Sequence, residues 1–352
     1  MKEYFGCDAH KHYSLFVSVN EVGQRGKFVR VEHDRNTLRA FLSKLPPKSP
    51  IAIESVGNWY WIIDEMEKAG HIPSLVHAAK AKLMMGQINK TDKIDTEGLA
   101  ILQRNGTLPS VWIPPGEIRD QRELLRMRMA LVHVRTMLKN RIHATLAKYA
   151  IQITEVSDIF GVRGRELIQK QSNELPLQTR ACVETQLKIL DQIEEQIKLC
   201  EEKIETLIEK TPVMKILMSL PGVGPILGTV IALEIGDINR FPDASHLASY
   251  AGTVPRVHSS GGKTFYGRTR SDVNQYLKWA FIEAANVIVL NQNQWVNRHV
   301  VQLYKRIKTR KGHGKAVVAL ARHLAEASYW VIKKNEAYRE PKVNRPVLSI
   351  QK

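Results

Sequence analysis

Cysteine is scarce in this sequence, with 3 residues in a chain of 352. Cys7, Cys182 and Cys200 are too far apart for a disulfide framework or for the paired spacing of a zinc finger. His10 and His12 lie close to Cys7, but alternation along a strand turns Cys7 to the face opposite both histidines. We therefore expect no metal site formed by Cys7, His10 and His12.

Long apolar runs are also missing from the sequence. No segment reaches the ~18 consecutive apolar residues of a membrane-spanning helix. Residues 1–12 are too polar for the apolar region of a secretory signal. These absences predict a cytoplasmic protein without a membrane partner.

Acidic residues are few relative to basic ones. The chain holds 35 Asp and Glu against 52 Lys and Arg, which gives a formal net charge of +17. Such an excess predicts a polyanionic partner, and nucleic acid is the first candidate. The length of 352 residues predicts two or three domains with substantial cores.

The first part of the chain has the pattern of a layered α/β domain. Short alternating or apolar runs predict strands, and amphipathic segments predict helices. The first three strands follow one another through turn residues, so we expect an antiparallel meander followed by alternating helices and strands. The predicted strands are 4–11, 13–19, 27–31, 51–54 and 72–76, and the predicted helices are 36–42, 59–69 and one beginning at 91 or 92.

Four carboxylates stand out in this domain. Asp8 lies in the first predicted strand, and Glu54 ends the fourth. Asp92 and Asp95 share one face at the start of a later helix. A carboxylate in an apolar strand costs desolvation free energy unless it is paired or bound to metal. Taken separately, Asp8 also fits a turn-bonding residue at a strand end, and the helical pair also fits a favourable acidic first turn.

A ribonuclease-H-like strand order would bring these carboxylates together. In that fold, strands one and four are neighbours, which places Asp8 beside Glu54. A helix packed over that edge adds Asp92 and Asp95. Oxygen ligands of this kind suit Mg²⁺ or Mn²⁺, and two such ions about 4 Å apart stabilise in-line displacement at phosphorus. We therefore predict a metal site formed by these residues.

Two long amphipathic helices are predicted in the middle of the chain, at about 118–149 and 177–210. Their apolar residues recur at alternating spacings of three and four, as in a heptad seam. The two helices would form an antiparallel coiled-coil arm, with 150–176 as an irregular connection at its tip. Ordinary core packing or dimerisation explains the same seam.

A glycine-rich turn at 220–224 (LPGVG) lies between two helical segments. It is similar to a helix-hairpin-helix motif, in which backbone N–H groups at the following helix bind a phosphate without reading bases. Gly222 and Gly224 are therefore candidate nucleic-acid-binding residues. A tight turn between helices is the alternative.

Ser259 and Ser260 lie in a loop of small residues amid basic ones. The ending at 262–264 (GKT) invites a P-loop interpretation, but the earlier glycine is missing and no strand leads in, so ATP binding is excluded. An extended loop points neighbouring serines in opposite directions. Ser260 directly precedes Gly261-Gly262, where absent side chains leave room for a DNA backbone, so we choose Ser260 to face a phosphate. The alternative is that both serines bond the turn.

Basic residues near the serines and further along the chain are candidate phosphate contacts. Those after the serines are suited to balance charge on a phosphate, and a second cluster precedes a helix predicted at 315–334. The tail at 338–352 is predicted to be disordered. The candidate contacts are Lys263, Arg268, Arg270, Lys308 and Arg310.

In their order along the chain, these segments resemble the DEDD-type insertion-sequence transposases (the insertion sequence one-hundred-ten family), also called bridge-RNA-guided serine recombinases. The resemblance covers nearly the whole chain, and the ordered set is specific although each motif alone is weak. One departure is 272–274 (DVN), where the family often has a glycine beside the asparagine. The matching segments are 6–11 (GCDAHK), 54–57 (ESVG), 90–95 (KTDKID), 220–224 (LPGVG), 250–252 (YAG) with Pro255, 258–263 (HSSGGK) and 267–268 (GR).

This resemblance implies a RuvC-like domain at 1–112, a coiled-coil arm at 113–211, a mostly helical transposase domain with a serine loop at 212–337 and a tail at 338–352. It implies that DNA strands are cut and rejoined through a phosphoserine, with Mg²⁺ or Mn²⁺ at the carboxylates, and it aligns Ser260 with the nucleophile. It also implies a bacterial or archaeal cell, a guide-type RNA that pairs with donor and target DNA, and dimers that become tetramers on DNA. In the family, the carboxylates of one subunit act with the serine of another.

Two other functions fit the same residues. A junction resolvase or nuclease would use the carboxylates with water as the nucleophile, and it would leave free DNA ends. A non-catalytic protein would package DNA on its basic surface, and loss of the carboxylates would not affect it.

Overall fold

The computed structural model describes residues 1–55, 57–86 and 91–341 of the chain. The chain divides into two compact units, Met1–Pro114 and Pro115–Lys352. Val56 and Lys90 of the family motifs lie outside the described residues, as do residues 342–352 of the predicted tail. Disorder from 338 is wrong for the start of that tail, because the Tyr338 backbone nitrogen donates to Ser219 Oγ at 2.8 Å and Glu340 accepts from Arg298 at 2.9 Å. No helix in the described ranges is both long and apolar enough to cross a membrane.

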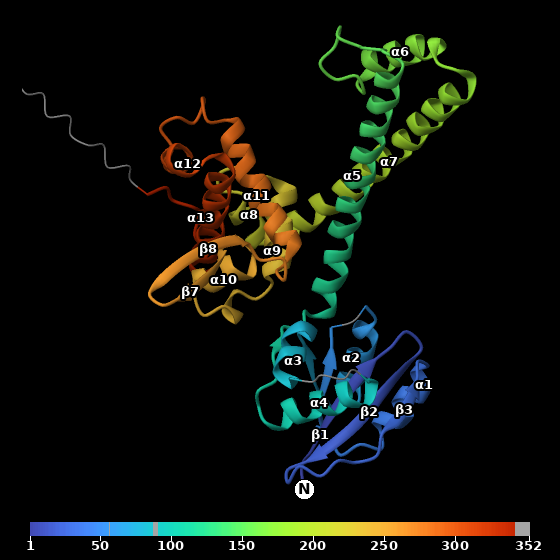
Figure 1. The fold of residues 1–352 in the computed structure, drawn as a ribbon, viewed down its shortest axis with the longest axis vertical. Helices are drawn as coiled ribbons and strands as arrows, with labels where there is room; N and C mark the ends of the chain where they lie inside the picture. Colours follow the sequence, from blue (N-terminus) through green and yellow to red (C-terminus); the bar gives the residue numbers. More distant parts are fainter. Residues whose placement is uncertain (56, 87–90, 342–352) are drawn as a thin grey trace, which may run out of the picture. The chain divides into compact units, whose positions relative to one another are not determined.

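The first unit is a mixed α/β domain built on a six-stranded sheet (Figure 1). In sheet order the strands are β3 (Val29–Glu32), β2 (Tyr13–Asn20), β1 (Glu3–Ala9), β4 (Pro50–Glu54), β5 (Ile72–Val76) and β6 (Ser110–Val111). The meander of β1, β2 and β3 is antiparallel as predicted, and β4 lies parallel beside β1, which confirms that strands one and four are neighbours. The antiparallel edge strand β6 was not predicted.

Helices cover both faces of this sheet. The predicted helices at 36–42, 59–69 and from 91 are confirmed within one or two residues, and α3 is additional. Cys7 and Ile53 pack with Leu38 on one face, while Ala52 packs with Leu99 on the other. Burial raises the pKa of the Cys7 thiol, which makes this cysteine an inert core residue. The helices are α1 (Arg35–Leu42), α2 (Trp59–Lys68), α3 (Ala78–Met85) and α4 (Asp92–Arg104).

Gly6 sets how closely α4 approaches β1. A β-carbon at this position would lie 2.0 Å from the carbonyl oxygen of Thr96 and 2.9 Å from the backbone nitrogen of Ala100. The backbone of α4 therefore crosses β1 at a point where only glycine leaves room. This close approach brings the start of α4 toward the end of β1.

A Gly6→Ala variant is expected to lose about 1–3 kcal/mol of stability in the first unit, because the obstructing atoms are backbone and cannot swing aside. Denaturant unfolding followed by circular dichroism measures this loss. The matched control is Gly57→Ala, since nothing lies within 4 Å of a β-carbon built at that glycine; its stability should change by less than about 1 kcal/mol. Equal stability of Gly6→Ala and the wild type would contradict the backbone contact.

The second unit begins with two long helices, α5 (Gly116–Lys148) and α7 (Leu177–Lys210). They run antiparallel, because residues later in α5 contact residues earlier in α7. Arg128 Nε donates to Glu201 Oε1 at 2.9 Å, and the Tyr149 hydroxyl lies 3.2 Å from Thr179 Oγ1. Both predicted helices are therefore confirmed, whereas a coiled-coil supertwist stays a prediction.

The connection between these helices is not irregular, and that prediction is wrong. It contains α6 (Val162–Gln171) and a 3-10 turn (Ser172–Glu174), which lie at one end of the helix pair (Figure 1). Ile168 of α6 packs with Ile142 and Val183 in a small core of its own. Burying this apolar surface stabilises the connection in a way that local patterns do not reveal.

The rest of the second unit is mostly helical around one core. Apolar side chains from nearly every helix meet there, among them Ile231, Phe281 and Leu320, all fully buried. The elements are α8 (Pro212–Leu217), α9 (Pro225–Ile235), a 3-10 turn (Ile238–Arg240), α10 (Ala244–Tyr250), β7 (Pro255–Ser260), β8 (Lys263–Thr269), α11 (Gln275–Leu290), α12 (His299–Lys311) and α13 (His313–Lys334).

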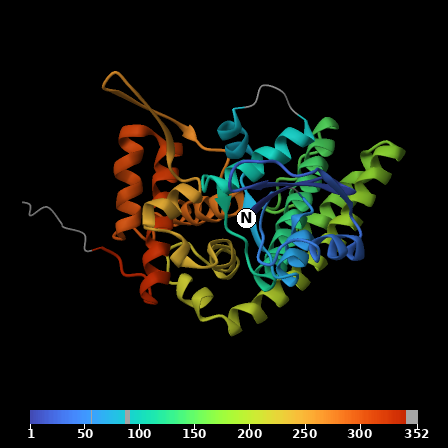
Figure 2. The ribbon, with the colours of Figure 1, turned by 90° about the horizontal axis from the view of Figure 1, so that it is seen from below.

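The serine loop is a β-hairpin, which corrects the predicted loop. Strands β7 and β8 pair antiparallel and are joined by Gly261 and Gly262, whose φ angles are 56° and 77°. Positive φ at both central residues is the signature of a type I′ turn, whose twist matches that of paired strands. The hairpin projects away from the neighbouring helices of its unit (Figures 1 and 2).

Candidate functional site

Asp8 and Glu54 lie at the carboxyl ends of two neighbouring parallel strands. The register of β1 and β4 pairs Cys7 with Ile53, so the next residues along are Asp8 and Glu54. Val76, the partner of Glu54 on β5, packs in the core that α4 covers. Because directly paired residues share a face, both carboxylates belong to the α4 side of the sheet.

Helix α4 begins at this side of the sheet with two acidic residues in its first turn, Asp92 and Asp95. Thr91 caps the helix, and its Oγ1 accepts a hydrogen bond from the backbone nitrogen of Ile94 at 3.3 Å. This cap fixes the first turn in place. The helix packs over β1, β2 and β4, as the sequence predicted for the helix that carries Asp92 and Asp95.

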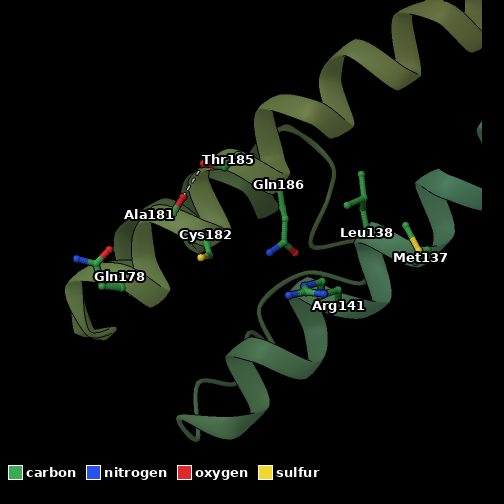
Figure 3. Close-up of a pocket in the computed structure, with 8 residues that line it drawn as sticks. All are labelled: Met137, Leu138, Arg141, Gln178, Ala181, Cys182, Thr185 and Gln186. Carbon is green, nitrogen blue, oxygen red and sulfur yellow. Dashed lines mark hydrogen bonds between the residues drawn. The ribbon is translucent and has the colours of Figure 1, made fainter.

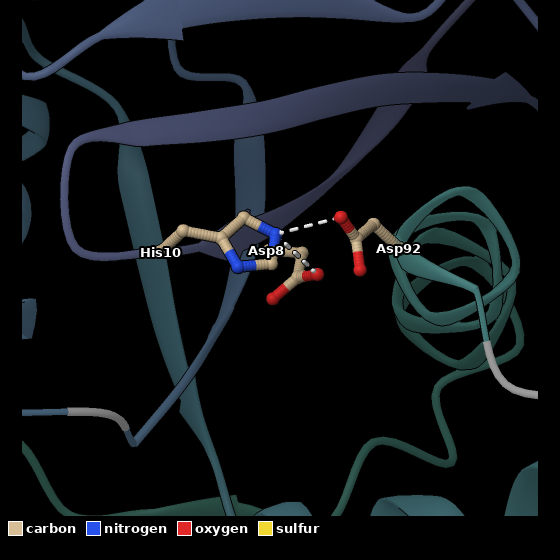
Figure 4. Close-up of side chains that lie close together, drawn as sticks. All are labelled: Asp8, His10 and Asp92. Atoms are coloured by element: carbon tan, nitrogen blue, oxygen red, sulfur yellow. Dashed lines mark ion pairs between the residues drawn. The ribbon is translucent and has the colours of Figure 1, made fainter.

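His10 connects Asp8 with Asp92. Its Nε2 lies 3.2 Å from Oδ2 of Asp8 and 3.2 Å from Oδ2 of Asp92 (Figure 4). This nitrogen is buried yet makes no well-aligned hydrogen bond. Potential ligand atoms of these three residues lie within 4.8 Å of one another, and they form the one such group of metal-ligating side chains among the described residues.

Glu54 and Asp95 stand outside this close group. They lie on the same side of the sheet, at the end of β4 and in the first turn of α4, but their carboxylates are not among the atoms within 4.8 Å of one another. The structure thus brings Asp8 and Asp92 together through His10, and it places the other two carboxylates on the elements that flank them.

The sequence analysis did not predict a role for His10 or Tyr13. The Tyr13 hydroxyl donates to Asp92 Oδ2 at 3.3 Å, and its ring centroid lies 4.6 Å from that of His10. Burial and, next, the negative charge of Asp92 raise the pKa of Tyr13. Alternation along β1 turned His10 away from Cys7, but it gave no contact with Asp92, which lies on α4. Cys7 is buried in the core on the opposite face of the sheet.

Ser259 and Ser260 lie at the tip of the β7–β8 hairpin and point to opposite faces of it. Ser260 pairs with Lys263, and Ser259 pairs with Thr264. The Ser259 hydroxyl lies 3.5 Å from Thr264 Oγ1, whereas the Ser260 hydroxyl makes no side-chain hydrogen bond within the described part of the chain. Ser260 therefore keeps its hydroxyl available beside a lysine.

The chain that follows the hairpin is fixed by Asn274, which caps α11, and Lys278 of α11 donates to Thr269 at the end of β8 at 2.9 Å. The Oδ1 of Asn274 accepts from the backbone nitrogen of Leu277 at 3.0 Å, and its Nδ2 donates to Glu234 Oε2 at 2.8 Å. Arg270, just after β8, donates from Nε to Asp272 Oδ1 at 3.0 Å, and this hydrogen bond lowers the pKa of Asp272. Among the basic residues near the hairpin, the positive charge of Arg270 is therefore already compensated by Asp272.

The other candidate nucleic-acid contacts fall on separate elements. Lys308 and Arg310 are exposed in the last turns of α12. Gly222 has φ of 75°, and a β-carbon there would lie 2.3 Å from the Ala284 carbonyl oxygen, so packing against α11 is enough to require a glycine. Gly224 is the cap of α9, where nothing lies within 4 Å of a β-carbon.

Two cavities open on the second unit. One of about 450 Å³ lies between α5 and α7, and Arg141 and Gln186 line it with Cys182 (Figure 3). The other, of about 420 Å³, lies at the base of the β7–β8 hairpin, where Arg256 and His258 line it. The second cavity is the one associated with the predicted site residues.

Comparison with known proteins finds transposases that match segments of both units. Residues 5–151 match the DEDD transposase model of the IS110 type, and residues 214–301 match the model for the transposase IS116/IS110/IS902 family. A probable family 20 transposase of Pseudomonas aeruginosa is 24% identical over 312 residues, which cover 87% of this chain and 90% of that protein.

Two further relatives are named as insertion-sequence transposases. The transposase for element IS1328 of Yersinia enterocolitica is 25% identical over 86% of this chain and 89% of its own length. The transposase for element IS1111A of Coxiella burnetii is 27% identical over 71% of this chain and 69% of its own length. Transposase models of the IS110 type match segments of both units in order, and these relatives are named as transposases, so the chain is a DNA transposase similar to the IS116/IS110/IS902 family.

Proposed function

We propose that this transposase cuts and rejoins DNA through a covalent phosphoserine formed by Ser260, assisted by Mg²⁺ or Mn²⁺ at the carboxylates. The observation that carries the proposal is the position of Ser260. It lies at the exposed tip of a basic hairpin, its hydroxyl is uncommitted, and two glycines follow it. A projecting strand tip can approach a DNA backbone that a side chain in a packed core cannot reach.

The donor set of the first unit fits a divalent ion, which the match to the DEDD transposase model implies. The carboxylates of Asp8, Glu54, Asp92 and Asp95 are the oxygen ligands that Mg²⁺ and Mn²⁺ prefer. The buried His10 Nε2 without an aligned hydrogen bond adds a further donor directed into the group. A bound divalent ion would supply stabilisation of the charge that develops on the phosphoryl oxygens.

The chain's own groups account for the remaining steps. The Ser260 oxygen forms a bond to phosphorus as the phosphorus–sugar oxygen bond breaks, the serine proton is lost, and the departing sugar oxygen gains a proton. Lys263, directly across the hairpin from Ser260, is placed to balance negative charge on the phosphate. Attack by a sugar hydroxyl on the phosphoserine reverses these changes. The number of phosphoester bonds is conserved, so rejoining needs no ATP.

We further propose a guide-type RNA that pairs with donor and target DNA, and dimers that form tetramers on DNA so that the carboxylates of one subunit act with the serine of another. The net charge of +17 supports a nucleic-acid partner. In this proposal the chain comprises a RuvC-like domain at 1–112, a coiled-coil arm at 113–211 and a helical transposase domain at 212–337.

A nuclease that uses water instead of Ser260 is the second candidate. The clustering of Asp8 and Asp92 around His10 favours it as much as the phosphoserine reaction. The two differ in their products, because the nuclease leaves free DNA ends and no covalent protein–DNA species.

The RNA partner gives a direct test of the proposed guidance. Protein purified at low salt from cells that carry its insertion sequence should contain one specific RNA. Raising the salt concentration should release that RNA steeply, as counterion release requires. If the protein still recombines the same DNA sites at the full rate after all RNA has been removed, RNA guidance is contradicted and the plain nuclease is favoured.

A further inference from the structure

The β7–β8 hairpin exposes two aromatic side chains in a row. Phe265 is 65% exposed and Tyr266 is 73% exposed. Large aromatic rings cost free energy in water, and adjacent exposed rings on a projecting strand are typical of a binding surface. They are neighbours in sequence, so the strand directs them to opposite faces of the hairpin.

The register assigns each ring to one of two faces. Ser260 pairs with Lys263, and two residues further from the tip His258 pairs with Phe265; these four residues form what we call the serine face. The opposite face consists of Ser259 with Thr264 and Val257 with Tyr266. Phe265 is therefore on the same face as the proposed nucleophile, and Tyr266 is on the other.

The charge around this hairpin complements a nucleic acid. Lys263 lies at the tip, and the cavity of about 420 Å³ at the base is lined by Arg256 and by Arg270, which is paired with Asp272. Lys263 and Arg256 thus place a cation toward each end of the hairpin that carries Phe265, which suits a polymer whose phosphates lie on either side of a base. A two-stranded β-ribbon is also of a size that a DNA groove admits.

We propose that the β7–β8 hairpin enters a groove of the DNA with its serine face toward the strand to be cut, and that Phe265 stacks on a base a short distance along that strand from the scissile phosphate. Two residues along a strand span ~7 Å, or about two base steps of 3.4 Å, so the stacked base lies about two positions from the cut. Stacking unpairs that base and holds the phosphate against Ser260. The inference rests on the proposed function only in using Ser260 to identify the face turned to DNA.

The test uses the full-length protein with any RNA that it retains. The DNA is a series of duplexes of the element's own end, each of which carries 2-aminopurine at a different position. This base fluoresces more strongly when it is unstacked from its neighbours. Binding of the wild type should raise the fluorescence at positions within about two steps of the cut. Phe265→Ala should abolish that rise and weaken binding about tenfold, and Phe265→Leu should also abolish the rise although it keeps an apolar side chain.

Tyr266→Ala is the matched control, because it removes a neighbouring ring of similar exposure from the opposite face. It should keep the fluorescence rise and the binding. A rise that persists in Phe265→Ala, a rise absent from the wild type, or loss in Tyr266→Ala alone would each overturn the inference.

Ser260→Ala separates this inference from the proposed function. The variant should keep the fluorescence rise, because stacking does not need the hydroxyl, while it loses the covalent protein–DNA species. If Ser260→Ala still forms that species, the nucleophile assignment fails and the stacking result stands on its own. If covalent chemistry depends on Ser260 and Phe265→Ala still unstacks the base, the stacking inference alone fails.

Discussion

An Asp8→Ala variant is expected to cut DNA at least about a thousandfold more slowly than the wild type. A divalent ion at a phosphoryl-transfer site contributes several kcal/mol of charge stabilisation, and each ~1.4 kcal/mol changes the rate tenfold. Asp8 is the carboxylate most enclosed in the group, with 13% of its side chain exposed and His10 Nε2 at 3.2 Å. Cleavage of a labelled duplex in Mg²⁺ and in Mn²⁺ measures the loss. Glu54→Ala, Asp92→Ala and Asp95→Ala should also abolish recombination.

Two further measurements make the Asp8 result specific. Binding of Mn²⁺, followed by electron paramagnetic resonance, should weaken in Asp8→Ala, while DNA binding should persist because phosphate contacts lie elsewhere in the chain. Glu67→Ala is the control, since it removes an exposed carboxylate from α2 and should change neither property. Wild-type cleavage by Asp8→Ala would exclude the metal site.

A Ser260→Ala variant is expected to lose strand cleavage and recombination altogether, whereas Ser259→Ala should keep most of both. The two serines are neighbours on opposite faces of the hairpin, and Ser259 contacts Thr264 across it. Removing the Ser260 oxygen removes the proposed nucleophile itself. Trapping on a suicide substrate nicked near the crossover measures the covalent product.

The pair of serine variants has three informative outcomes. Loss of the trapped species in Ser260→Ala alone agrees with the assignment. Loss in Ser259→Ala alone moves the nucleophile to Ser259 and to the opposite face of the hairpin. Trapping by both variants removes serine from the chemistry. Circular dichroism of both proteins establishes that the fold is unchanged.

Much of the first unit was predictable because its strands carry their own periodic signals. Alternation and turn residues predicted the meander, and the apolar run ending in Glu54 predicted β4, which a ribonuclease-H-like strand order places beside β1. The reason for Gly6 was not predictable, because the obstructing carbonyl of Thr96 lies ninety residues further along the chain. Only the packed structure reveals that α4 crosses β1 at that point.

In the candidate site, too, residues with a local sequence pattern were predicted, and residues placed by long-range packing were not. Asp8 and Asp92 were predicted from the strand and the helix cap that carry them, and the structure brings them together. His10 was missed because its contact with Asp92 depends on how α4 packs beside the end of β1, which no local pattern reveals. The hairpin was missed because neither strand shows an apolar face; Val257, Phe265 and Tyr266 are all exposed. Gly261-Gly262 alone carried the turn signal.

Mass spectrometry of the protein trapped on DNA tests the central claim most directly. Digestion with trypsin cuts after Arg256 and Lys263, which leaves both serines in the peptide 257–263 (VHSSGGK). Nuclease treatment then reduces the attached DNA to a short nucleotide remnant, and fragmentation of the peptide locates the modified residue. We predict a phosphodiester-linked nucleotide on Ser260. Efficient cleavage that yields only free DNA ends and an unmodified peptide would contradict the phosphoserine reaction and assign the nucleophile to water.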